Sequence, residues 1–123
     1  MKKLLWLDDL RNPFKEHKVS VQYVCYKYMD IEPSDMDKEV EVIWVKTSSD
    51  FERYITECGL PDFISFDNDL GIGCGEGYGC AKFLVNYCLD HELQLPNYYV
   101  HSMNTVAREN IQALFDNFED HTK

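Results

Sequence analysis

The chain has few of the features that would assign it to a specialised class of protein. The 123 residues include only four prolines and six glycines, and no low-complexity segment or internal repeat stands out. Its apolar runs fall well short of the ~20 residues that span a bilayer. Only four apolar residues separate Lys3 from Asp8, which is too short for the core of a signal peptide. We therefore expect a single cytoplasmic domain over residues 1–123, with no membrane partner.

Positive charge is scarce. The chain has 12 Lys and Arg against 22 Asp and Glu, which gives a formal net charge of -10. An extended nucleic-acid surface needs clustered basic residues, so this balance argues against one. Docking of a single phosphate through a metal ion remains compatible with an acidic protein.

Cysteine is present but not in a metal-binding pattern. The five cysteines lack the paired short spacing of a zinc site. Cys58, Cys80 and Cys88 fall on apolar faces of predicted helices. We therefore interpret them as ordinary buried thiols.

Two apolar stretches end in paired carboxylates. Residues 4–7 and 63–66 predict short buried strands. The first leads into Asp8 and Asp9, and the second into Asp67 and Asp69. An unpaired carboxylate is costly to bury, so these groups need water, a cation or hydrogen-bond donors at the strand exits.

Further strands are predicted at residues 40–45 and 98–100, and helices at 49–58, 80–88 and 105–118. Ser49 with Glu52 fits a capping box at the start of the first helix, and Gly59 suits its C-terminal cap. Strands alternating with helices predict a parallel α/β sheet with right-handed crossovers. We expect the strand order 2-1-3-4, with no fifth strand.

Two segments are harder to interpret. Residues 14–39 form an insertion after the first strand, and the β-branched and aromatic stretch from Val19 to Tyr28 predicts an extra strand, antiparallel at a sheet edge. Residues 71–79 alternate glycine with other residues and lack the spacing of a phosphate-binding loop. This connection is either a flexible loop or a mobile cover over the carboxylates.

Ligands of open parallel sheets bind beyond the carboxyl ends of the strands. Strands one and three are neighbours in the expected order, so their four carboxylates converge there. An all-oxygen set favours Mg²⁺ or Mn²⁺, and we predict that Asp8, Asp9, Asp67 and Asp69 hold such an ion. The alternative is that Asp8 or Asp9 caps a turn while Asp69 is solvated.

The fourth strand leads into His101, Ser102 and Asn104. His101 at this strand end is a candidate proton carrier, although many histidines are only packed or solvent-facing. Ser102, Asn104 and the N-terminus of the following helix predict a phosphate site. Arg108 and Arg11 could reach the same anion, or could be surface cations.

The pattern of strand ends resembles the receiver domain of two-component response regulators. In that family an acidic pair binds Mg²⁺ and an aspartate on the third strand accepts phosphate. Asp8, Asp9, Asp67 and Ser102 match these places. The resemblance implies a flavodoxin/receiver-like three-layer fold, although the fifth strand and its lysine have no counterpart.

A closer resemblance is to the cyclic-phosphate processing receiver-like family, found in bacteria and phages and inferred to act in RNA end processing. Its motifs are similar to Leu7–Pro13, Phe66–Gly71 and His101–Asn104 with Arg108–Asn110. Asn68 stands where that family usually has His, and Thr105 and Ala107 replace its usual Pro and Gly. These departures leave a binding-only member open as an alternative.

Two functional hypotheses follow. The first is a metal-dependent enzyme that acts on a phosphoester of a nucleotide or RNA end, such as a 2′,3′-cyclic phosphate, with His101 and Asp67 as catalytic residues. The second is a non-catalytic receiver-like module. A phosphatase of the haloacid dehalogenase type ranks below both, since Leu70 follows Asp69 where that pattern has Thr or Val. A thinly covered sheet face also predicts a homodimer.

Overall fold

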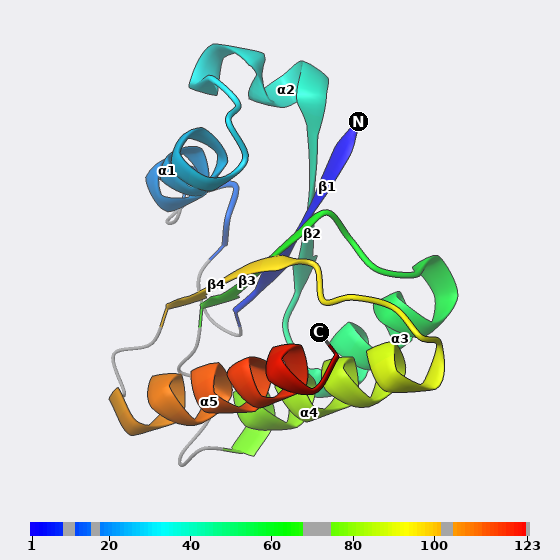
Figure 1. The fold of residues 1–123 in the computed structure, drawn as a ribbon. Coiled ribbons are helices and arrows are strands. Elements are labelled where there is room, and N and C mark those ends of the chain that lie inside the picture. Colours follow the sequence, from blue (N-terminus) through cyan, green and yellow to red (C-terminus); the bar gives the residue numbers. More distant parts are fainter. Residues whose placement is uncertain (9–11, 16–17, 68–74, 102–104, 123) are drawn as a thin grey trace.

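The computed structural model of the chain describes residues 1–8, 12–15, 18–67, 75–101 and 105–122. Its described strands form one parallel sheet in the order β2-β1-β3-β4 (Figure 1). The strands are β1 (Lys2–Leu7), β2 (Val40–Val45), β3 (Phe63–Asp67) and β4 (Asn97–His101). The predicted α/β class and strand order are confirmed.

The central strand β1 is apolar because both of its faces are covered. It pairs with β2 on one side and with β3 on the other. Leu4, Leu5, Trp6 and Leu7 are completely buried. A strand that is buried on both faces is a continuous apolar run rather than an alternating one, as the sequence predicted here.

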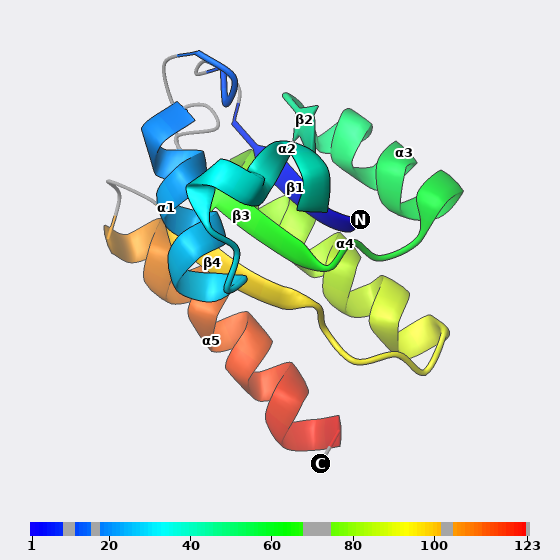
Figure 2. The ribbon, with the colours of Figure 1, turned by 90° about the horizontal axis from the view of Figure 1, so that it is seen from above.

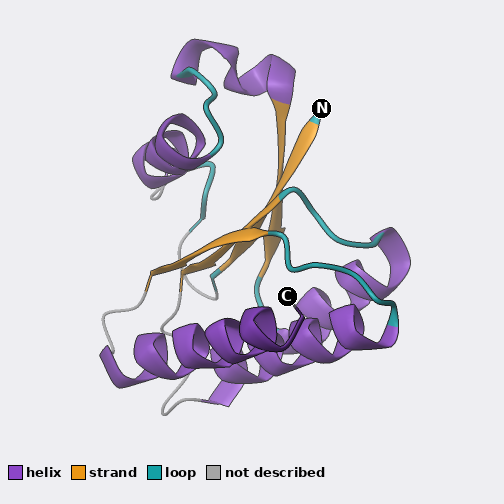
Figure 3. Cartoon of the chain, in the orientation of Figure 1, coloured by secondary structure: helices purple, strands orange, loops and turns teal. Residues whose placement is uncertain are grey.

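Three helices pack against one face of the sheet: α3 (Ser48–Cys58), α4 (Gly75–Asp90) and α5 (Thr105–Thr122). They form a helical layer below the strands in Figure 3. Phe66 is at the centre of this core, with its ring centroid 6.0 Å from that of Phe51 and 5.5 Å from that of Phe115. Aromatic pairs at these separations add to the stability that burial gives.

The opposite face is covered by α1 (Lys18–Tyr28) together with the short helices η1 (Pro33–Asp35) and α2 (Met36–Glu39). Figure 2 looks down on this layer. Val21, Val24 and Cys25 of α1 are buried in a second core with Leu4 and Trp6 of β1. The fold is therefore the three-layer arrangement that the sequence predicted.

The prediction of an extra strand over Val19–Tyr28 is wrong, because this stretch is the helix α1. Strand propensity of valine and tyrosine favoured the wrong structure here. The three buried residues, at positions 21, 24 and 25, have helical rather than alternating spacing. Packing of that one stripe onto the sheet outweighed the local preference of the chain.

The other helices differ from prediction at their ends. The N-cap of α3 is Thr47, whose hydroxyl accepts a hydrogen bond from the Asp50 amide at 3.1 Å, rather than Ser49. Gly59 has the positive φ of 83° expected after the helix, whereas Cys58 is exposed and not buried. Helix α4 begins at Gly75, so the second half of the glycine-rich segment is helical rather than a loop.

No helix within the described part of the chain is both long and apolar enough to cross a membrane.

Candidate functional site at the carboxyl ends of the strands

Three predicted site residues come together at one edge of the sheet. Leu7 pairs with Phe66, so positions 8 and 67, one residue further along β1 and β3, are neighbours. Asp67 in turn pairs with His101 of β4. Residues that are far apart in the sequence therefore form one row across the carboxyl ends of β1, β3 and β4.

Asp8 is fixed by its backbone. Its amide donates to the Val45 carbonyl at 3.1 Å, and its carbonyl accepts a hydrogen bond from the Trp44 indole Nε1 at 2.8 Å. The residue is only 4% exposed. A carboxylate buried to this extent needs compensating charge or hydrogen bonds.

The row of residues that precedes these strand ends, two residues earlier along each strand, forms one boundary of the site. Trp44, Trp6, Ser65 and Tyr99 follow one another across the four strands. Because alternate residues of a strand share a face, this row lies on the same face as positions 8, 67 and 101. Trp6 and Ser65 are fully buried, and the Ser65 hydroxyl has no hydrogen-bond partner among the described residues. The site is therefore bounded on this side by packed side chains.

Lys46 is a residue that the sequence analysis missed. It follows Val45, the register partner of Leu7, and so occupies the position beside Asp8 at the end of β2. Its Nζ lies 4.3 Å from the ring centroid of Trp44, whose indole binds the Asp8 carbonyl. The cation–π contact holds a positive charge at the rim of the row. The sequence contained a signal for it: Lys46 directly follows the apolar strand β2, just as Asp8 directly follows β1.

The other predicted site residues are placed differently. Arg108 lies in the first turn of α5 and is exposed. Asp9, Arg11, Asp69, Ser102 and Asn104 lie outside the described residues, as does the segment 71–74. For Asp67 and His101 the structure gives the position in the strand and no more.

The donor set at this edge fits a hard cation. Asp8 is buried beside position 67, which is also an aspartate, and carboxylate oxygens are the ligands that Mg²⁺ and Mn²⁺ prefer. Among the side chains that the structure describes, no three His, Cys, Asp or Glu residues form a group able to hold a metal. Asp9 and Asp69 lie outside that set, so the metal site remains a prediction.

The fold and this row of strand ends define a receiver-like α/β domain. The sequence model of the cyclic-phosphate processing receiver domain matches residues 3–117. The chain therefore belongs to the cyclic-phosphate processing receiver domain family. The family predicted from the motifs at the strand ends is confirmed.

The comparison with solved structures found matches at low sequence identity. One is a fusion that contains the trimeric coiled coil of yeast Spc42, amino acids 181–211, with a TM-score of 0.51 and 15% identity. The similarity covers 92% of this chain but only 63% of that one. Another is the N-terminal domain of a response regulator/sensory box/GGDEF three-domain protein from Carboxydothermus hydrogenoformans, with a TM-score of 0.48, 17% identity, and coverage of 99% and 100%. A comparison with curated proteins gave no match.

Proposed function

We propose that the protein is a metal-dependent phosphoesterase that opens 2′,3′-cyclic phosphates, such as those at RNA ends. The observation that supports this proposal is the row formed by positions 8, 67 and 101 at the ends of three neighbouring strands. Membership of a family named for cyclic-phosphate processing supports the substrate class. A terminal phosphate can dock alone, which suits a chain of net charge -10.

In this proposal Asp8, Asp9, Asp67 and Asp69 would hold Mg²⁺ or Mn²⁺, directly or through water. The bound ion would supply charge neutralisation and polarise the phosphoryl group. The backbone of Asp8 is hydrogen-bonded to Val45 and Trp44, so the sheet fixes the position from which its carboxylate would bind the ion.

The remaining phosphate oxygens would be bound by Ser102, Asn104, Arg108 and Arg11. Lys46 is a further candidate for this role, because it brings a positive charge to the same edge from β2. Water forms a new bond to phosphorus, and one of the two P–O bonds to the ribose breaks. His101 would carry the proton of the water to the departing ribose oxygen, which yields a phosphomonoester and a free hydroxyl.

The test is turnover of a nucleoside 2′,3′-cyclic phosphate in the presence of Mg²⁺ or Mn²⁺. The Asp67→Asn variant should lose at least a hundredfold in kcat/KM, because it removes one negative charge from the site. Asp62 is a matched control at the other end of β3, where its carboxylate accepts a hydrogen bond from the Lys3 amide at 2.7 Å. Equal rates for Asp67→Asn and Asp62→Asn, or no turnover by the wild type, would remove the enzyme hypothesis for this substrate.

A non-catalytic receiver-like module is the second candidate. Asn68 favours it, since that position usually carries a histidine in the family. The receiver-like fold suits a binding module equally well. Titration calorimetry distinguishes the enzyme from the binding module. A binding module binds Mg²⁺ and a cyclic nucleotide, and the cyclic nucleotide is recovered unchanged at the end of the experiment.

A further inference from the structure

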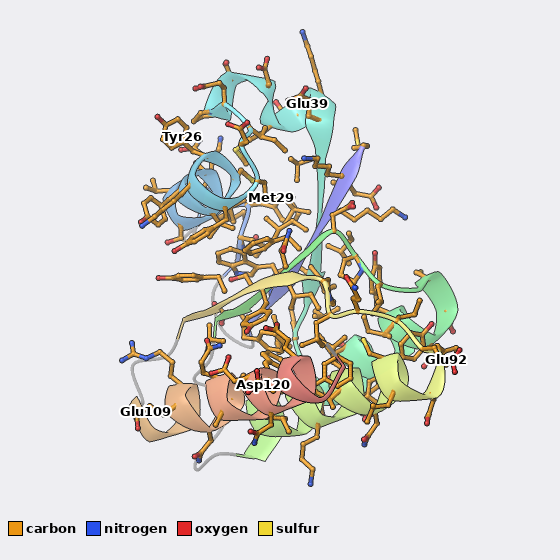
Figure 4. The ribbon with its side chains drawn as sticks, in the orientation of Figure 1. Tyr26, Met29, Glu39, Glu92, Glu109 and Asp120 are labelled. Atoms are coloured by element: carbon orange, nitrogen blue, oxygen red, sulfur yellow. The ribbon has the colours of Figure 1, made fainter. Side chains whose placement is uncertain are left out.

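Helix α1 is apolar on the side turned away from the protein as well as on the side that packs on the sheet. Val19, Tyr23 and Tyr26 are spaced as one face of a helix and are 76%, 47% and 58% exposed. Figure 4 shows Tyr26 on the outer side of α1, whereas Met29 lies between α1 and the sheet. A surface helix usually has a polar outer face, so this face is suited to a ligand.

The aromatic surface continues from α1 onto the sheet. The ring centroid of Tyr28 is 4.8 Å from that of Tyr99 on β4 and 6.4 Å from that of Tyr23. Tyr99 is two residues before His101 in the same strand. In addition, α1 begins near the carboxyl ends of the strands and crosses the sheet from there (Figure 2). The tyrosines therefore extend away from the candidate site.

This part of an acidic protein is locally basic. Residues 12–28 contain three lysines, Lys15, Lys18 and Lys27, and one acidic residue, Glu16. The Lys27 ammonium donates a hydrogen bond to the Tyr23 hydroxyl at 2.9 Å and lies 5.4 Å from the centroid of that ring. The same hydrogen bond raises the pKa of Lys27, which keeps the group charged. Exposed aromatic rings with interspersed cations are typical of surfaces that bind single-stranded nucleic acid.

We propose that the outer face of α1, with Tyr23, Tyr26 and Lys27, binds the nucleotides that precede the cyclic phosphate of an RNA substrate. The inference rests on the proposed function and names RNA, rather than a mononucleotide, as the substrate. Bases would stack on the tyrosine rings while lysines neutralise the backbone. The charge of this face selects a polyanion over a second copy of the chain, whose net charge of -10 opposes self-association.

The surface is local. Helix α1 has 11 residues and is therefore about 16 Å long, which is room for a few nucleotides. This size agrees with the expectation that the protein has no extended nucleic-acid surface.

The experiment measures fluorescence anisotropy with a short single-stranded RNA that ends in a 3′-hydroxyl, so that binding is independent of turnover. The Tyr23→Ala/Tyr26→Ala double variant should bind at least tenfold more weakly, because stacking on one aromatic ring already contributes about that factor. Tyr23→Phe, which keeps the ring, should bind the RNA with nearly the affinity of the wild type. Leu89→Ala/Leu93→Ala is the matched control, since these exposed residues lie in the last turn of α4 and just beyond it, on the other side of the sheet from α1.

Each outcome decides the inference. Wild-type affinity of the double tyrosine variant would overturn it, as would a dimer in light scattering that this variant disrupts while RNA binding is unchanged. Weaker binding by the double alanine variant, together with nearly wild-type binding by Tyr23→Phe, would support it. Turnover of a mononucleoside cyclic phosphate by the wild type is measured separately, so failure of the proposed function and failure of this inference are distinguishable.

Discussion

The contact between Trp44 and Asp8 gives the sharpest test of how the sheet holds the candidate site. The Trp44→Phe substitution keeps an aromatic ring in the same row of the sheet. It deletes the indole N–H that donates to the Asp8 carbonyl at 2.8 Å. It also weakens the ring that Lys46 covers, because phenyl binds a cation less strongly than indole does.

The magnitude follows from this geometry. A neutral hydrogen bond contributes about 0.5–1.5 kcal/mol, and a carbonyl left without its donor adds a desolvation cost when it is buried. The Trp44–Asp8 bond is only partly buried. We therefore expect the free energy of unfolding to fall by about 1–2 kcal/mol, within the usual range for a single substitution. Turnover of the cyclic nucleotide should fall by about tenfold, because a small displacement of a catalytic group is costly.

Urea unfolding and turnover are measured on the same preparations. With a slope of roughly 1–3 kcal/mol/M, the midpoint should move by about 0.3–2 M. Tyr98→Phe is the matched control, because it removes the hydrogen bond from Gln112 to the Tyr98 hydroxyl at 2.9 Å on the other face of the sheet. It should lose similar stability and keep its turnover. The reasoning is refuted if both variants lose turnover equally, or if Trp44→Phe unfolds at the wild-type midpoint.

Three further predictions concern Lys46 and the cysteines. Lys46→Ala should raise KM for the cyclic nucleotide roughly tenfold or more with little change in the unfolding midpoint, as loss of a charge-assisted phosphate contact predicts; an unchanged KM in steady-state kinetics would rule out that contact. Burial raises the pKa of the Cys25 and Cys88 thiols to about 11, whereas Cys58 is exposed. Iodoacetamide at pH 8 should therefore label Cys58 before Cys25 and Cys88, as read by peptide mass spectrometry, and equally fast labelling of Cys88 would contradict the structure. The folded state binds the protons of the two buried thiols more tightly, so their contribution to stability is lost as the pH rises from about 9 to about 11, which urea midpoints across this range would measure.

The amino-acid pattern was enough to predict the sheet and the edge at which the candidate site lies. The short apolar runs at residues 4–7 and 63–66 have apolar side chains on both faces of a strand, so both faces must be buried. Helices on both sides of a parallel sheet provide that burial. Carboxylates directly after these runs then had to lie at the carboxyl ends. The motifs there were specific enough to identify the family before the fold was known.

Tertiary structure alone decided the conformation of residues 18–28 and the surroundings of Asp8. Local preference favoured a strand for this valine- and tyrosine-rich stretch, but only a helix places Val21, Val24 and Cys25 together against Leu4 and Trp6. Likewise, the hydrogen bond from Trp44 and the position of Lys46 depend on which residue of β2 lies beside which residue of β1. No spacing along the chain contains that information, because register is set by packing between segments almost 40 residues apart.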